Sequence, residues 1–158
     1  MDFHTAYSLL IAHITPHPWD HTTPDGDTLR VIPACYPAGP GEAEVTLRLV
    51  TATAAAAGVT ITDLVPDDAD GATEIGLTTV ALPGLIAALR DQTVWQHEQG
   101  YDEHIAVTPS PQGVALDADG LFGTRTQMTL SPAQRLPLAS ALERALDVAR
   151  EWEDPEQP

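Results

Sequence analysis

The chain has 158 residues, and its 23 acidic and 7 basic side chains give a formal net charge of −16 at pH 7. All seven basic residues are arginine, and the chain contains neither lysine nor asparagine. Phosphate binding requires basic side chains that displace counterions, so this composition argues against direct nucleic-acid binding and favours a basic protein partner.

The same composition has explanations that involve no partner. A GC-rich gene disfavours the codons of lysine and asparagine, and a salt-adapted organism gains from excess surface carboxylates. Cys35 is the only cysteine, so an intrachain disulfide is excluded, and no apolar run reaches the roughly 18 residues of a membrane span. The first residues also lack the basic region of a secretory signal. We therefore expect a cytoplasmic protein with no membrane segment and a single domain over residues 1–158.

Residues 1–27 are expected to form a short apolar segment and then a loop, because three prolines and a glycine interrupt Thr15–Asp27. Alternation of apolar and polar residues then indicates strands, most clearly where Val45, Leu47 and Leu49 fall on one side. We predict strands at residues 28–34, 44–51 and 59–64, with one helical turn or a bulged strand at 52–57.

An acidic loop, residues 66–72, leads into the second half of the chain. We predict a strand at 73–82, and then a helix because Pro83 fits the first turn. This helix ends before Gly100, and its buried face is Leu82, Leu85, Ile86 and Leu89. Further strands are predicted at 103–108, 114–118 and 121–130, with Asp119-Gly120 as a two-residue hairpin turn.

The last predicted element is a helix from Leu136 to Trp152, which ends before a frayed tail at 153–158. Pro137 is placed in its first turn, and Ser131–Gln134 forms a preceding turn or a short separate helix. In the strand before it, Phe122, Met128 and Leu130 share one face. The buried stripe of the helix recurs at three- and four-residue steps, as Leu138, Leu142, Ala145, Leu146, Ala149 and Trp152.

These elements predict an α+β domain, with an antiparallel, mostly meandering sheet and two main helices packed on one face. A short repeat supports this organisation. The segment Thr79–Pro83 leads into one helix much as Gln127–Pro132 leads into the other.

Three histidines spaced by four residues, His13, His17 and His21, are weighed with Cys35 as zinc ligands. Pro16 and Pro18 prevent a helix that would bring the histidines to one face, and the close ligand pairs typical of zinc sites are missing. Exposed loop histidines are the favoured interpretation. We therefore predict no metal and no cofactor, with this quartet kept as the alternative.

The segment from His97 to His104 is the densest polar cluster. Imidazole and carboxylate groups side by side can perform general acid–base chemistry, so an enzyme of this kind is an alternative function. A polar loop between the middle helix and the next strand explains the same residues without catalysis. The cluster also lacks the His-Glu-x-x-His spacing of zinc proteases.

The sequence Leu130-Ser131-Pro132-Ala133-Gln134, followed by Leu138-Ala139-Ser140-Ala141-Leu142, resembles a pattern in short uncharacterised acidic α+β proteins of GC-rich actinobacteria and their phages. The resemblance covers about 25 residues, and it implies a hairpin followed by an Ala/Leu-rich helix. It transfers no catalytic residues. The predicted element order is also similar to half of a sliding-clamp-like domain, but the basic inner surface of a clamp is missing.

We predict a small, non-enzymatic binding protein that docks on a basic protein partner, such as a nucleic-acid enzyme, with inhibition as one expected consequence. The candidate binding surface joins two acidic segments: Asp67, Asp68 and Asp70, and Glu98, Asp102 and Glu103. The alternatives are the metal-dependent or His/carboxylate enzyme and a homo-oligomeric structural protein. In the latter, Trp152 and the helix stripe would lie partly at a subunit interface.

Overall fold

The computed structural model describes residues 18–33, 37–39, 42–100 and 102–153. Over these residues the chain forms two antiparallel sheets and three α-helices, which confirms the α+β class. The first half contains β1 (Trp19–Thr22), β2 (Thr28–Ile32), β3 (Pro37–Gly39), β4 (Glu42–Val50), α2 (Ala52–Ala56), β5 (Ala72–Thr78) and α3 (Leu82–Asp91). The second half contains β6 (Trp95–Gln99), β7 (Glu103–Ser110), β8 (Gly113–Asp119), the 3₁₀ turn η1 (Leu121–Gly123), β9 (Arg125–Leu130) and α4 (Pro132–Glu153).

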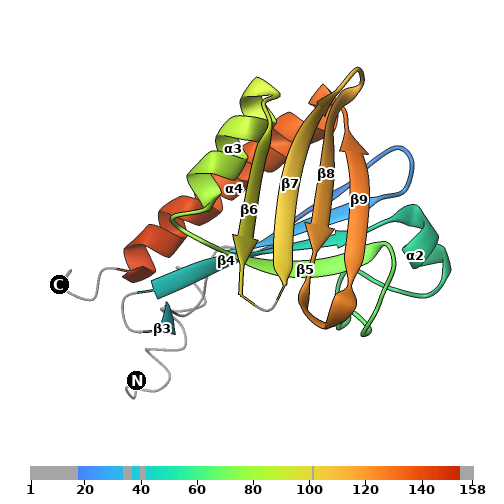
Figure 1. Cartoon of the computed structure of the whole chain (residues 1–158), viewed down its shortest axis with the longest axis horizontal. Coiled ribbons are helices and arrows are strands. Elements are labelled where there is room, and N and C mark those ends of the chain that lie inside the picture. Colours follow the sequence, from blue (N-terminus) through green and yellow to red (C-terminus); the bar gives the residue numbers. More distant parts are fainter. Residues whose placement is uncertain (1–17, 34–36, 40–41, 101, 154–158) are drawn as a thin grey trace, which may run out of the picture.

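The predicted meander occurs twice, because the strands divide between two sheets instead of forming one. In the first sheet β1, β2, β4 and β5 pair in that order, and β3 pairs with the beginning of β4. The second sheet runs β6, β7, β8, β9 in chain order. Figure 1 shows β6–β9 upright, crossing in front of β4 and β5, with the β6–β7 and β8–β9 turns at the same end. Both turns therefore lie near β5, an edge strand of the first sheet.

One hydrophobic core fills the space between the sheets and the two long helices. In β4 the predicted alternation is confirmed: Val45, Leu47 and Leu49 are buried, while Glu44 is exposed on the outer face. Burial of each such side chain stabilises the fold by about 1.5–3 kcal/mol. The second sheet contributes buried side chains from β7, β8 and β9, namely Ile105, Val107, Leu116, Met128 and Leu130.

The two long helices are exchanged between the halves. The helix α3 follows the first meander, yet its strand contacts are with β6 and β7 of the second sheet. The helix α4 follows the second meander, yet it lies mainly on β4 and β2 of the first. The two helices pack against each other along the side of the molecule (Figure 1). Each half therefore covers apolar surface that belongs to the other.

The helix α4 begins at Pro132, earlier than predicted, because the Gln134 side chain reaches back and caps its start at Ser131. The backbone N–H of Ser131 donates to Oε1 of Gln134 at 2.7 Å, and Pro132 occupies the first turn, where its missing N–H costs nothing. Pro137 consequently lies inside the helix, and its predicted first-turn position is wrong. Because proline has no N–H, the carbonyl of Ala133 lacks its helical hydrogen bond. Ala133 is exposed, so water can donate to that carbonyl instead.

The predicted stripe of α4 is buried at each position that the structure describes. The Trp152 side chain lies outside the described residues. The buried members, each at most 4% exposed, are Leu138, Leu142, Ala145, Leu146 and Ala149.

Several other predicted elements differ from the structure. Residues 59–64 form an irregular segment instead of a strand, because Arg48 of β4 takes the carbonyl groups of Ile61 and Asp63, at 2.7 and 2.9 Å. The strand β1 lies within the predicted loop at 15–27, and β6 lies where the middle helix was expected to continue. The apolar segment Met1–Ile14 falls outside the described residues. None of the described helices is long and apolar enough to cross a membrane.

Candidate functional site

The structure places the two predicted acidic segments at one end of the molecule. Asp67, Asp68 and Asp70 lie in the loop that precedes β5, and all three are exposed. Glu98 lies near the end of β6, Asp102 lies in the turn that follows, and Glu103 begins β7. Glu98 and Asp102 are exposed, whereas Glu103 is only 9% exposed.

The loop before β5 is held against the turn between β8 and β9. The Asp68 N–H donates to the carbonyl of Phe122 at 2.8 Å, and the Arg125 N–H donates to that of Ala69 at 2.9 Å. The Gly71 N–H also donates to the Arg125 carbonyl, at 2.6 Å. The acidic loop thereby extends along the free edge of β9 as a short parallel bridge. It is an ordered part of the surface.

The turn itself departs from the prediction. Asp119-Gly120 does not form a two-residue turn, because the chain continues through η1 before β9 begins at Arg125. Phe122 is therefore in the turn, where its side chain is 72% exposed, and its predicted place on the strand face with Met128 is wrong. Its φ of 61° is left-handed, as is that of Asp68 at 56°. Such conformations cost about 1–3 kcal/mol in a non-glycine residue, and they concentrate at functional sites.

Three adjoining hollows connect the two acidic segments into one surface. The first, of about 260 Å³, lies between Leu64–Val65 and the turn at Leu121–Phe122. The second, also about 260 Å³, lies over Glu44 and Gly76 and shares Glu74 and Leu121 with the first. The third, about 410 Å³, surrounds the β6–β7 turn and shares Gln99 and Glu103 with the second. We call these three hollows together the acidic trough.

Among the described residues that line the trough, the ionisable side chains are carboxylates and the imidazole of His104, and none is an arginine. Of the six predicted residues, Asp68 and Asp70 do not line the trough, since they face the β8–β9 turn and the edge of β9. The lining carboxylates are the predicted Asp67, Glu98, Asp102 and Glu103, together with Glu44 and Glu74, which the sequence analysis missed.

Two side chains make the polar contacts beneath the trough, one between the sheets and one within the first sheet. The amide of Gln99 donates to the carbonyl of Gly76 at 2.7 Å and to Oε2 of Glu103 at 2.9 Å, which ties β6 to the edge of β5. Arg48 donates to Oε1 of Glu74 at 2.7 Å from the outer face of β4. The charge of Glu74 is therefore partly neutralised, and the other carboxylates dominate the potential of the trough.

The proposed pair of catalytic histidines is not brought together. Glu98 and His104 are direct partners in the β6–β7 register, so His97 lies on the opposite face of that sheet. There His97 stacks on Trp95, with ring centroids 6.1 Å apart. The imidazoles of His97 and His104 therefore lie on opposite faces of the sheet.

His104 faces a carboxylate pair on the outer side of the second sheet. Burial raises the pKa of Asp117 above its usual value, the nearby charge of Asp119 raises it further, and His104 lowers it. The alternative zinc quartet is outside the described residues except for His21, which lies in β1 and stacks on Trp19 with centroids 5.6 Å apart. Among the described residues, no three His, Cys, Asp or Glu side chains are placed to hold a metal.

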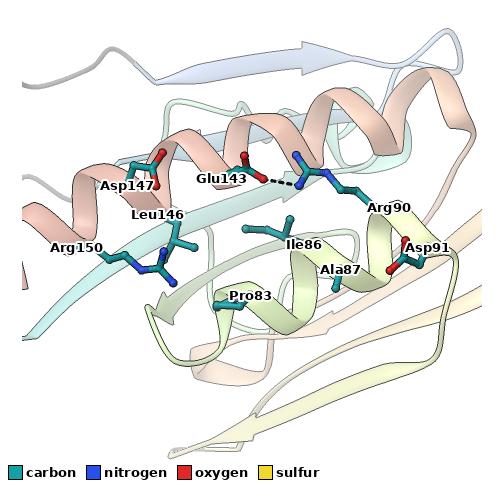
Figure 2. A pocket seen from close by; sticks show the side chains of 9 residues that line it. All are labelled: Pro83, Ile86, Ala87, Arg90, Asp91, Glu143, Leu146, Asp147 and Arg150. Atoms are coloured by element: carbon teal, nitrogen blue, oxygen red, sulfur yellow. Dashed lines mark hydrogen bonds and ion pairs between the residues drawn. The ribbon is translucent and has the colours of Figure 1, made fainter.

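A larger hollow, of about 530 Å³, lies between α3 and α4. Figure 2 shows Ile86 and Leu146 facing each other across it, with the Arg90–Glu143 ion pair at one end and Arg150 at the other. Arginines and carboxylates both line this groove, so it favours ligands of neither charge. The described members of the α4 stripe are buried within the chain itself.

Comparison with known proteins gives little further information. No family model matches the chain, and no curated protein matches it. Among solved structures, the chain is similar to one from the crystal structures of Trypanosoma brucei MRP1/MRP2, with 15% identity and a TM-score of 0.47. The likeness covers 92% of this chain and 94% of that chain. At these values it carries no argument about function.

Proposed function

We propose that this protein is a non-enzymatic binding protein that docks a basic protein partner along the acidic trough. The observation that carries the proposal is the continuity of the trough, which joins two acidic segments distant in the sequence through Glu44 and Glu74. Several arginines that could neutralise this surface are engaged elsewhere. Arg30 pairs with Asp20, Arg90 with Glu143, and Arg135 with backbone carbonyls.

A concave surface of one sign raises the local concentration of oppositely charged partners and speeds their encounter. If the partner uses its basic surface for nucleic acid, docking covers that surface. Inhibition of nucleic-acid binding by the partner is then the expected consequence. The net charge of −16 supports the same proposal, because it opposes direct binding of nucleic acid by this chain.

The proposal is tested by pull-down from cell lysate with three proteins. These are the wild type, the trough variant Glu44→Lys/Glu98→Lys, and the control Asp147→Lys/Glu151→Lys on α4. The two variants have the same net charge, and all four altered residues are exposed. We expect the wild type and the control to retain a partner that salt releases, and the trough variant to lose it. A partner kept by all three proteins, or kept at high salt, contradicts the proposal.

A further inference from the structure

The acidic trough ends in an apolar patch. Among the described residues, six large hydrophobic side chains are exposed, and three of them line the first hollow: Leu64, Leu121 and Phe122. They are 86%, 40% and 72% exposed. Single exposed apolar residues are common, but a group around one hollow indicates a contact surface.

Both walls of this hollow are held in place before any partner binds. Arg48 fixes the wall that carries Leu64, through its bonds to the carbonyls of Ile61 and Asp63. The Asp68 N–H fixes the opposite wall through the carbonyl of Phe122, whose left-handed backbone directs the phenyl ring outward. A preformed hollow requires little ordering on binding, which favours its use as the position of an anchor side chain.

The charge around the hollow decides which occupant it suits. Asp67 and Glu74 line the hollow itself, and the trough continues from it past Glu44 and Glu103. A second copy of this chain carries the same charge of −16 and is repelled, as is an anionic membrane surface. At about 260 Å³, the hollow is smaller than a typical small-molecule pocket and suits one side chain.

We propose that the partner presents a basic segment with one large apolar side chain, which inserts between Leu64 and Phe122 while the basic residues follow the trough. The inference rests on the proposed function and adds the mode of recognition. The apolar anchor positions the segment, because the carboxylates alone attract any cation without fixing its register. The carboxylates exclude apolar partners that lack positive charge, because such a partner would remove water from the carboxylates without offering a cation in its place.

The test begins with parallel selections of a random twelve-residue peptide library on the full-length wild type and on Phe122→Ser. We expect the enriched peptides to combine a net positive charge with one recurrent aromatic or branched aliphatic residue. A synthetic consensus peptide is then compared with a version whose anchor is replaced by serine. The anchor should strengthen binding to the wild type by about 10- to 100-fold, as expected for burial of one large apolar side chain.

Variants of the protein locate the effect. Phe122→Ser and Leu64→Ser should each reduce the advantage of the anchored peptide to about threefold or less. The control Val94→Ser removes an equally exposed apolar side chain from the α3–β6 connection and should leave the advantage unchanged. All three positions are exposed, so unfolding is not expected, and circular dichroism checks it.

The outcomes separate the two proposals. Basic peptides without a recurrent apolar residue, or an anchor effect equal in all variants, overturn the anchoring inference and leave the proposed function standing. Enrichment of neutral or acidic peptides, or no enrichment on the preformed surface, overturns both.

Discussion

Replacing Arg48 should show whether the outer face of the first sheet is held as described. Arg48 and Arg30 are direct partners on adjacent strands β4 and β2, so they lie on the same face. Both pair with a carboxylate, but the side chain of Arg48 is 8% exposed and that of Arg30 is 19% exposed. We expect Arg48→Met to lower the free energy of unfolding by about 3 kcal/mol, and Arg30→Met by less than about 1 kcal/mol.

The larger value follows from the hydrogen bonds that Arg48 makes. It donates to two backbone carbonyls and to Glu74, and each bond from a charged donor contributes about 1.5 kcal/mol. Its buried Nε has no hydrogen-bond partner, so removing this group offsets the loss of unfolding free energy by about 1 kcal/mol. Among the described residues, Arg30 pairs with Asp20, whose side chain is 45% exposed, and exposed pairs contribute at most about 1 kcal/mol.

Urea unfolding followed by circular dichroism measures both variants under the same conditions. Amide hydrogen exchange at Leu64 and Val65 gives a second readout, since only Arg48→Met should accelerate it. Equal losses of stability in the two variants would refute the assignment of Arg48 as the residue that holds the 59–64 segment. Unchanged exchange in Arg48→Met would refute it as well.

Three further predictions concern other parts of the molecule. Asp117→Asn should stabilise the protein at pH 7, and this gain should vanish in urea unfolding below about pH 4. The raised pKa means that the folded state favours the protonated acid and loses stability as the pH rises through that pKa. Thr73→Val should lower the free energy of unfolding by about 1–2 kcal/mol, because it removes the oxygen that accepts the buried Thr126 hydroxyl at 2.7 Å. Adding Thr126→Val to this variant should recover most of the loss in the same assay. Gly113→Ala should lower the melting temperature by several degrees, because its Cβ would lie 2.0 Å from the Leu130 carbonyl oxygen; an unchanged transition in calorimetry would show that the β7–β8 turn relaxes freely.

Much of the fold was predictable because the strands with one buried face alternate clearly. The pattern in β4 and β9 identified inner residues, and the spacing in α3 and α4 identified the helix faces. Of the strands that were missed, β1 and β6 share a reason. In β1 and β6 the inward positions are held by Trp and His, such as Trp95 and His97, and the remaining residues are polar. Such strands have little of the apolar alternation on which prediction depends.

The end of α3 was missed because its left-handed terminating residue is Gln92, where glycine or asparagine would have indicated the end. The division of the strands into two sheets was also beyond the sequence, since alternation identifies a buried face without identifying what covers it. The predicted two helices on one face assumed a single sheet. The exchange of α3 and α4 depends on that division.

Four of the six predicted acidic residues line the trough. They were predictable because a charged loop at the end of a strand is exposed whichever strands pair with one another. Glu44 and Glu74 were missed for a different reason. Each is an outward residue in a strand, and their position beside the trough depends on how the second sheet crosses β5. Phe122 was assigned to the strand face by alternation, but the extra residues of η1 shift it out of register.

The exchange of helices has a consequence for how the chain reaches its native state. During translation the first half leaves the ribosome before α4 has been made, so its strands β2 and β4 lack the helix that covers them. Completion of the fold therefore waits for the last helix to be released. Cleavage in the connection between Asp91 and Trp95 should give two fragments that acquire structure only when they are mixed.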